Sequence, residues 1–266
     1  MRFCTHLAIE PGDAVSILEK LRTRMRRERF QPTFLSVIVS PVYIIRRGLF
    51  RAIKDLAPFI SGNILDFGCG SKPYESLFSG AASYLGVDLE VTGHNHEDSK
   101  VDVFYDGKIL PFDNAQFDAV VSFEVFEHVF NLPEALREIN RVTKCGGFLL
   151  ISIPFAWNEH EVPYDFGRYT SFGISHTLRS ADYEIIEIRK TTTYLLAVFQ
   201  MFIAYLMQTE PRLRTLRYLR QICVMFPCTL AAYAANSLLP KRYEYYCNIV
   251  LLAKKITAPL DLPPGS

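Results

Sequence analysis

Short apolar runs alternate with helical segments along the middle of this chain, and this alternation constrains the fold more than any other feature. The clearest helical segment is Leu132–Thr143, where apolar residues recur at helical spacing. Strands and helices in alternation predict a parallel sheet whose strands are joined by crossover helices. We therefore expect an α/β fold whose first five strands are Ile64–Phe67, Tyr84–Val87, Val101–Tyr105, Phe117–Phe123 and Gly147–Ile153.

Two further strand-like runs, Tyr183–Thr191 and Tyr245–Lys254, bring the expected sheet to seven strands. Between them lie roughly fifty mostly apolar residues, far more than the few that usually join two strands. We expect residues 194–243 to be a helical insertion before the last strand. The main domain then covers residues 48–193 plus 244–258, and residues 1–47 form an arginine-rich N-terminal arm with a helix over 13–29.

Composition and charge exclude several classes of protein. Apolar residues make up 49% of the chain, which is enough for a full core. The formal net charge of +1 is far from the strongly basic balance of a nucleic-acid binder, so we predict no nucleic-acid partner. The six cysteines contain no CxxC pair, so we predict no zinc site and assign no metal ligands. Scattered thiols and an N-terminus without an apolar leader favour a cytoplasmic location.

Polar residues follow three successive strand-like runs at the point where each run ends. The first run ends in Asp66, and Gly68 and Gly70 let the backbone turn sharply and approach a ligand closely. Asp88 ends the second run, where a carboxylate can accept hydrogen bonds from both hydroxyls of a ribose. Asp106 ends the third, where a carboxylate can accept from an adenine amino group. Because ligands bind beyond the carboxyl ends of parallel strands, this pattern predicts a nucleoside-containing ligand.

The same motifs argue against two common nucleotide ligands. A dinucleotide fingerprint needs a third glycine where this chain has Pro73, and the P-loop pattern GxxxxGK[ST] is absent. Three carboxylates are also a poor setting for a polyphosphate, whereas they tolerate a cationic sulfonium. NAD and ATP are therefore disfavoured.

Five segments stand in order along the chain: ILDFGCG (64–70), YLGVD (84–88), YDGKILPF (105–112), FDAVVSFEVFEHV (117–129) and REINRVTKCGGFLLISIP (137–154). Together they resemble the motifs of class I S-adenosylmethionine-dependent methyltransferases of the type 11 group. The resemblance covers about residues 55–190 and implies a Rossmann-like sheet with helices on both faces. The stretch EHEVPYDFGRYTSFGI (159–174) is similar to a bacterial branch associated with surface-polysaccharide and lipid-linked glycan genes.

The resemblance also implies cofactor contacts at the matching positions. Those for the methionine end of S-adenosylmethionine are Asp66, Gly68 and Gly70, and the ribose would be bound by Asp88. The remaining contacts would be made by Asp106 and Gly107 beside the adenine and by Phe123 and Glu124 beneath the cofactor. The chain departs from many relatives at residues 71–74, where it reads Ser-Lys-Pro-Tyr instead of continuing with another glycine.

Methyl transfer is an in-line displacement, so holding the acceptor close to the sulfonium supplies much of the catalysis. A hydroxyl acceptor also needs a general base, and His160 is our first candidate because its ordinary pKa lies near neutrality. Asp165 and Glu161 would orient His160 or bind the substrate. The alternative is that Asp165 and Arg168 form a structural clasp, and His128 fits a helix start or a cofactor lid better than a base.

The apolar insertion leaves two interpretations open. Its uncharged runs, residues 191–207 and 221–239, are at or below the length that spans a bilayer, and Pro227 is expected to interrupt the second. Arginines lie between the runs, a pattern typical of peripheral membrane contact. A helical cap over the substrate pocket, or a homodimer interface, explains the same residues.

These observations lead us to expect transfer of a methyl group to a small-molecule, glycan or lipid-linked acceptor, with oxygen favoured as the methylated atom. One alternative is methylation of a quinone or another lipid-like ring, which the apolar insertion also suits. Another is a non-catalytic scaffold that binds the cofactor and partners a membrane glycan enzyme.

Overall fold

The computed structural model describes residues 27–90, 99–209 and 211–256. It contains one seven-stranded sheet with the strand order β3-β2-β1-β4-β5-β7-β6. Only β7 runs antiparallel to its neighbours, so the sheet is mostly parallel, as expected. Most of the helix expected over residues 13–29 lies outside the described residues. The strands are β1 (Ser61–Phe67), β2 (Gly80–Leu89), β3 (Val103–Tyr105), β4 (Phe117–Phe123), β5 (Thr143–Pro154), β6 (Tyr183–Lys190) and β7 (Asn248–Lys255).

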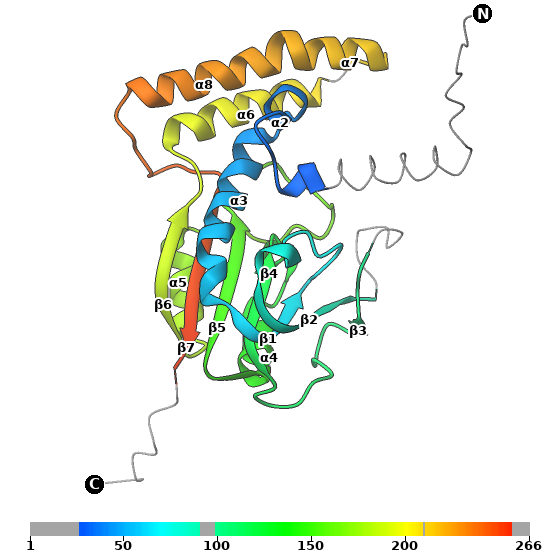
Figure 1. Ribbon diagram of the computed structural model, residues 1–266, viewed down its shortest axis with the longest axis vertical. Helices are drawn as coiled ribbons and strands as arrows, with labels where there is room; N and C mark the ends of the chain where they lie inside the picture. Colours follow the sequence, from blue (N-terminus) through cyan, green and yellow to red (C-terminus); the bar gives the residue numbers. More distant parts are fainter. Residues whose placement is uncertain (1–26, 91–98, 210, 257–266) are drawn as a thin grey trace, which may run out of the picture.

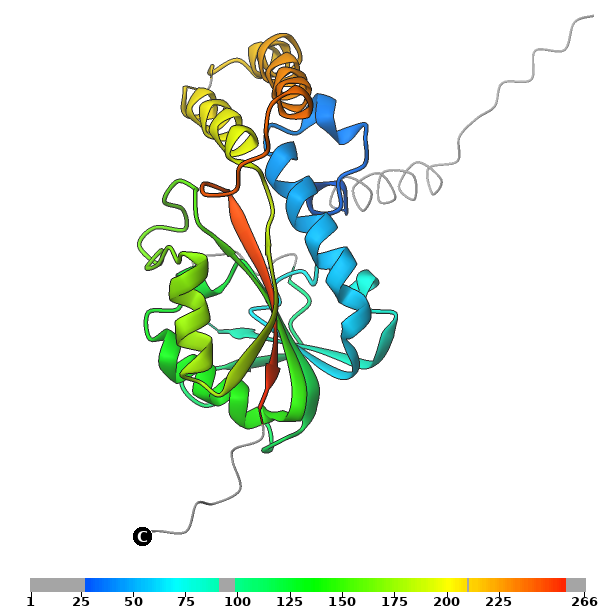
Figure 2. The same cartoon turned by 90° about the vertical axis from the view of Figure 1, so that its left-hand side faces the viewer.

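Helices cover both faces of the sheet, which confirms the predicted Rossmann-like α/β class (Figures 1 and 2). On one face lies α3 (Tyr43–Leu56), whose buried side chains pack against β1, β4, β5 and β7. On the other face lie α4 (Leu132–Val142) and α5 (Ser171–Arg179). Strands covered on both sides need apolar residues at consecutive positions, and the middle of β5, from Leu149 to Ile153, is buried without interruption.

A helical insertion precedes the last strand, again as expected. It consists of α6 (Tyr194–Gln208), α7 (Arg214–Arg220), the π-helix η5 (Gln221–Met225) and α8 (Phe226–Leu238). The chain enters α6 directly after β6, which runs parallel to β5, so the insertion stands at the carboxyl end of the parallel strands (Figure 1).

The N-terminal segment packs against this insertion although the two are far apart in sequence. Ile44 at the start of α3 shares a buried cluster with Leu196, Ile203 and Met225. The amide of Gln200 donates to the Pro41 carbonyl at 3.0 Å, and short α2 (Ser36–Val39) contacts α8. The start of α3 thus packs with the helices of the insertion, and we call these helices together the helical layer. The helix α3 begins five residues before the expected domain boundary at 48.

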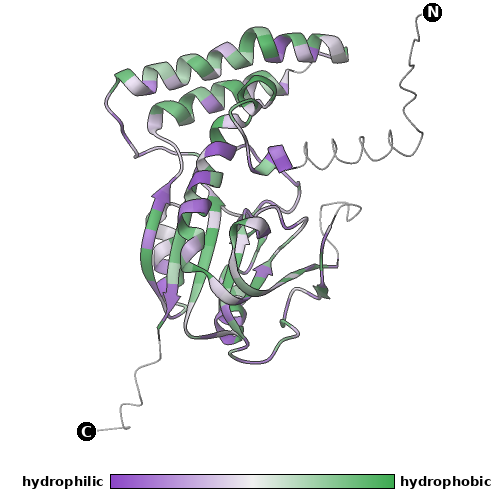
Figure 3. Ribbon diagram, in the orientation of Figure 1, coloured by the Kyte–Doolittle hydropathy of each residue, from purple (hydrophilic) through white to green (hydrophobic). Residues whose placement is uncertain are grey.

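The expectation that Pro227 interrupts the second apolar run was wrong. A proline removes a backbone donor and crowds the preceding turn, but here the π-helical turn η5 comes directly before it and Pro227 falls in the first turn of α8. The wider turn relieves the crowding. Residues 215–238 therefore form one helix of 24 residues, long and apolar enough to cross a membrane by length and composition, and 22% of its most apolar window is buried. Figure 3 shows apolar residues along this helix and along α6 beside it.

Candidate active site

The turn after β1 has the backbone shape that the two glycines predicted. Gly68 (φ 70°) and Gly70 (φ 46°) both adopt left-handed conformations that cost other residues energy. At Gly68 a Cβ would lie 2.6 Å from both methyl carbons of Val125, whereas at Gly70 a Cβ would meet no described residue within 4 Å. Gly68 is therefore required by packing, and Gly70 borders open space among the described residues.

The acid at the end of β2 meets this turn. The Asp88 carboxylate accepts from the Gly70 amide at 3.0 Å and from the Leu89 amide at 2.8 Å. Gly107 (φ 82°) lies next to the same strand end, because a Cβ on it would come within 3.1 Å of the Leu89 side chain. The fold thus brings Gly70, Asp88 and Gly107 together at one point on the edge of the sheet.

Asp106 and Asp66 differ sharply in environment. Asp106 is exposed, and its carboxylate accepts from the Lys108 amide at 2.9 Å, which lowers its pKa. Asp66 is 2% exposed and accepts from the Tyr84 hydroxyl at 2.7 Å. Burial raises the pKa of Asp66 to about 7 despite this hydrogen bond and nearby Lys72. The carboxyl of Asp66 is therefore held inside the protein by the Tyr84 hydroxyl of β2.

Lys72, within the segment that departs from many relatives, stabilises the same turn. Its side chain is largely buried and forms an ion pair with Asp102, whose carboxylate also accepts from the Gly86 amide at 2.6 Å. Lys72 itself has a left-handed backbone (φ 52°). This pair had no signal in the sequence, because thirty positions separate its members and no motif links them.

The two residues after β4 that were predicted to lie beneath the cofactor have internal partners. Phe123 packs edge-on against Tyr74, with ring centroids 5.0 Å apart, and stacks on Phe78. Glu124 has a left-handed backbone (φ 56°), accepts from the Ser152 hydroxyl at 2.7 Å, and accepts from Asn248 at 2.6 Å. Burial raises the pKa of Glu124. Asn248 lies on β7, and its part in the site had no signal in the sequence.

The turn η4 (Phe126–His128) carries a buried carboxyl group beside a histidine. The Glu127 side chain is fully buried, and burial together with the neighbouring Glu124 raises its pKa well above the usual range. The Glu127 backbone carbonyl accepts from the amides of Phe166 and Gly167, so η4 is held against the loop after β5. His128 Nδ1 lies 2.7 Å from the Tyr164 carbonyl oxygen in that loop.

The three residues predicted to be catalytic lie in the same loop. The rings of His160 and His128 meet edge-on with centroids 4.8 Å apart, and Glu161 Oε2 is 3.6 Å from His128 Nε2. Asp165 accepts from the His160 amide at 3.0 Å and from Arg168 Nη2 at 2.6 Å. The Arg168 hydrogen bonds lower the pKa of Asp165 to about 2, and burial together with His128 lowers the pKa of His160.

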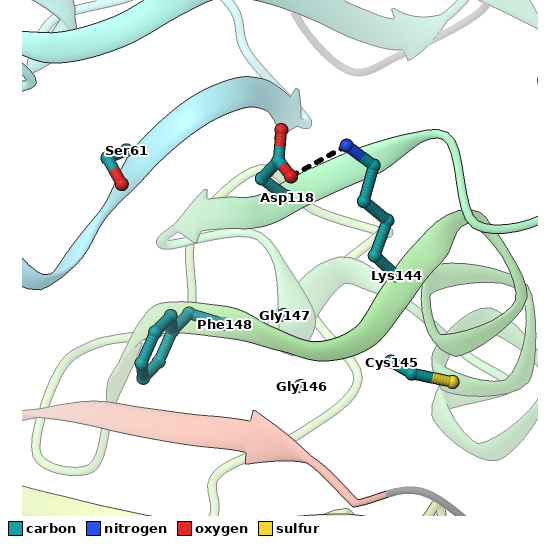
Figure 4. A pocket seen from close by; sticks show the side chains of 7 residues that line it. All are labelled: Ser61, Asp118, Lys144, Cys145, Gly146, Gly147 and Phe148. Atoms are coloured by element: carbon teal, nitrogen blue, oxygen red, sulfur yellow. Dashed lines mark hydrogen bonds and ion pairs between the residues drawn. The ribbon is translucent and has the colours of Figure 1, made fainter.

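The geometry therefore combines the two interpretations of Asp165. The carboxylate forms the clasp with Arg168 and also lies close to the His160 ring, whose Nδ1 is 3.2 Å from Asp165 Oδ2 and 3.3 Å from the Asn158 carbonyl oxygen. A hollow of about 230 Å³ lies elsewhere, at the amino ends of β1, β4 and β5, next to the ion pair of Lys144 with Asp118 (Figure 4). This hollow lies at the opposite end of the sheet from the strand-end acids and contains none of the predicted site residues.

Comparisons with known proteins agree with this geometry. A family model described as "Methyltransferase domain" matches residues 43–187. A malonyl-[acyl-carrier protein] O-methyltransferase from Erwinia pyrifoliae is 33% identical over 107 residues, covering 38% of this chain and 41% of that protein. A mitochondrial ubiquinone biosynthesis O-methyltransferase from Dictyostelium discoideum is 30% identical over 110 residues, covering 34% of each chain. The match spans less than half the length of either relative.

A solved structure shares the fold. It is the methyltransferase in a complex with the Haloferax volcanii Trm112 methyltransferase activator, with a TM-score of 0.52 and 15% sequence identity over 83% of this chain and 96% of that one. At this identity the likeness shows the arrangement of the sheet and helices alone.

Proposed function

This chain belongs to the methyltransferase-domain family, in the class I group that uses S-adenosylmethionine, and we propose that it methylates a small-molecule, glycan or lipid-linked acceptor at oxygen. The match of the family model covers residues 43–187, the part of the chain that carries the strand-end acids. The two relatives described above are O-methyltransferases by name, which supports oxygen as the methylated atom.

The hydrogen bond from the Gly70 amide to the Asp88 carboxylate is the observation that best supports the cofactor assignment. The open space at Gly70 leaves room for a ligand to lie against the backbone, and the Asp88 carboxylate stands 3.0 Å from its amide. A carboxylate there can accept from the two ribose hydroxyls while the turn holds it in place. The residues present therefore fit the cofactor, which when bound supplies the methyl group as a sulfonium.

The other residues around the cofactor would act in two ways. The exposed pair Asp106 and Gly107 is placed to receive the adenine beside Leu89. The buried residues Asp66 and Glu124 would lie at the methionine end and beneath the cofactor, and each is held in place by a hydrogen-bond partner inside the protein. Preformed turns lower the ordering cost of binding.

On the acceptor side we propose that His160 takes the proton of a hydroxyl acceptor, with Asp165 as its positioning residue. Asp165 accepts from the His160 backbone amide, and its Oδ2 lies 3.2 Å from the ring Nδ1, which is also 3.3 Å from the Asn158 carbonyl oxygen; these contacts would restrain the imidazole. Glu161, on the same loop and close to His128, would contact the acceptor.

We further propose that the enzyme is cytoplasmic and that its helical layer lies on a membrane surface. Large apolar side chains are exposed along both long helices, including Phe202 and Tyr205 on α6 and Leu219 and Ile222 on the 215–238 helix. Arg217 and Arg220 lie on the same helix, where anionic lipid would attract them. Pairing of two copies through this surface is the competing explanation.

A transfer assay with isotopically labelled S-adenosylmethionine tests the acceptor. Purified enzyme would be incubated separately with water-soluble glycan, lipid-linked glycan and quinone fractions from a bacterial membrane extract. We expect label in a glycan or lipid-linked glycan fraction, and a marked loss of it in His160→Ala. Label in the quinone fraction would instead support the ring-methylating alternative. Binding of the cofactor without transfer to any fraction would support the scaffold.

A further inference from the structure

The turn η4 buries a carboxyl group that accepts and donates no hydrogen bond among the described residues. The Glu127 side chain is 0% exposed, and neither of its oxygens has a hydrogen-bond partner there. The adjacent His128 Nε2 is also buried without a hydrogen-bond partner in the described part of the chain, and its nearest carboxyl oxygens lie 3.6 and 3.8 Å away, on Glu161 and Glu127. Leaving one buried polar atom unpaired costs about 1–3 kcal/mol, so three such atoms at one point indicate a missing ligand.

These atoms converge with a third donor from another loop. Ligand atoms of Glu127, His128 and His160 all lie within 4.8 Å of one another. Glu127 Oε1 is 3.8 Å from His128 Nε2, so the carboxylate is directed at the imidazole but is too far away for a hydrogen bond. Ligands of a zinc-sized ion lie roughly 3.3 Å apart, so closure would need shifts of about 1 Å.

Both histidines have the outer partners that metal-bound imidazoles usually have. His128 places Nδ1 against the Tyr164 carbonyl oxygen at 2.7 Å, which favours the tautomer with a free lone pair on Nε2. His160 places Nδ1 near Asp165 Oδ2 at 3.2 Å, and Arg168 holds that carboxylate. A carbonyl or carboxylate behind each ring fixes its orientation and raises its basicity.

The ligand atoms of the three residues favour one class of metal ion. One carboxylate and two imidazoles suit divalent first-row transition ions such as Zn²⁺, whereas Mg²⁺ and Ca²⁺ prefer oxygen ligands alone. Glu161 Oε2, 3.6 Å from His128 Nε2, stands at the same point and offers a further oxygen.

We propose that Glu127, His128 and His160 bind a divalent transition-metal cation at the carboxyl ends of β4 and β5. This site departs from the sequence-based prediction of no metal, because its ligands come from two loops with no metal-binding spacing. With the ion bound, His160 would be a metal ligand, so its proposed role as the base applies to the metal-free protein alone. Activation of an acceptor hydroxyl by the ion rests on the proposed function, but binding of the ion does not.

Calorimetric titration of the full chain with Zn²⁺ alone, after removal of bound metal with a chelator, tests the site. We expect one ion per chain, and at least tenfold weaker binding in Glu127→Gln and in His160→Gln. Co²⁺ titration gives a second readout, since imidazole and carboxylate ligands produce visible absorption bands that the same substitutions would remove. Mg²⁺ should bind far more weakly.

Two matched controls separate this site from surface binding. His176→Gln changes an exposed histidine on α5, and the double substitution His94→Gln with His96→Gln removes a closely spaced histidine pair in the sequence. Both variants should bind Zn²⁺ like the wild type. The proposal is wrong if wild-type protein binds no stoichiometric ion, or if only the His94 and His96 variant loses binding. S-adenosylmethionine binding by each variant reports folding, and its absence in wild-type protein would overturn the proposed function without affecting the metal site.

Discussion

The carboxyl edge of the sheet has two halves that treat their polar groups differently. After β1, β2 and β3, which we call the cofactor half, the acids already have partners in the protein, such as the Gly70 amide for Asp88 and the Lys108 amide for Asp106. After β4 and β5, the acceptor half, Glu127 and His128 bury atoms that have no hydrogen-bond partner among the described residues. The acids of the first half have hydrogen-bond partners in the protein without a ligand, and the Glu127 carboxyl group does not.

This difference affects how each half responds to its ligand. A turn held by its own backbone keeps its form whether or not a ligand is present, which makes binding less costly. A buried group without a partner destabilises the protein until a ligand arrives, and such strain concentrates at functional sites. We therefore expect substitutions in the cofactor half to weaken the fold or the cofactor affinity, and those at Glu127 to stabilise the fold while removing function.

Substituting the two glycines of the β1 turn should give the largest contrast within the cofactor half. In Gly68→Ala the left-handed backbone costs about 1–2 kcal/mol and the contact with Val125 about 1–3 kcal/mol more. Gly70→Ala meets no neighbour, so urea denaturation should show only the backbone cost, while cofactor affinity falls at least tenfold. Equal destabilisation by both substitutions would contradict the different roles of the two positions.

Asp66 should make stability depend on pH. Its folded pKa of about 7 lies above the ordinary 3.8, so the protonated carboxyl stabilises the fold at low pH, and this contribution is lost as pH rises through 7. The wild type should lose about 2–3 kcal/mol relative to Asp66→Asn between pH 5 and pH 8. Urea denaturation at both pH values measures this, and a constant difference between the two proteins would refute the buried, protonated carboxyl.

Glu127→Met tests the acceptor half in the opposite direction. Methionine fills a similar volume without polar atoms, so the free energy of unfolding of chelator-treated protein should rise by about 1–3 kcal/mol. We expect Zn²⁺ to raise the melting temperature of the wild type and to leave that of this variant unchanged. A drop in stability would mean that the carboxylate already has a partner within the fold.

The helical layer should show the smallest effect. Replacing the exposed Leu219 and Ile222 by serine removes apolar surface from the 215–238 helix and should weaken binding to anionic vesicles at least tenfold in sedimentation. Phe59→Ser, at the far end of the sheet, is the matched control and should bind like the wild type. Unchanged vesicle binding with conversion of a dimer to a monomer would assign the surface to self-association.

The cofactor half could be predicted from the sequence because its residues are local. Glycines and acids follow strands within a few positions, and parallel strands bring those ends together without further information. The strand β4 has the predicted bounds; β1, β2 and β5 are longer than predicted, and β3, β6 and β7 are shorter.

The acceptor half could not be predicted to the same degree, since its contacts join distant segments. Glu127 meets His160 only after the loop beyond β5 folds back on η4, and Asn248 reaches Glu124 from the last strand. The helix continues through Pro227 because a π-helical turn comes before it. Local helix propensity does not predict such a turn.

Calorimetric titration with S-adenosylmethionine and S-adenosylhomocysteine, run beside Asp88→Ala, tests the cofactor site at the sheet edge. We expect micromolar binding by the wild type and at least tenfold weaker binding by the variant, roughly 1.4 kcal/mol, because the carboxylate expected to bind the ribose is gone. Absence of binding by the folded wild-type protein, or equal binding by Asp88→Ala, would contradict the cofactor site at the ends of β1 and β2.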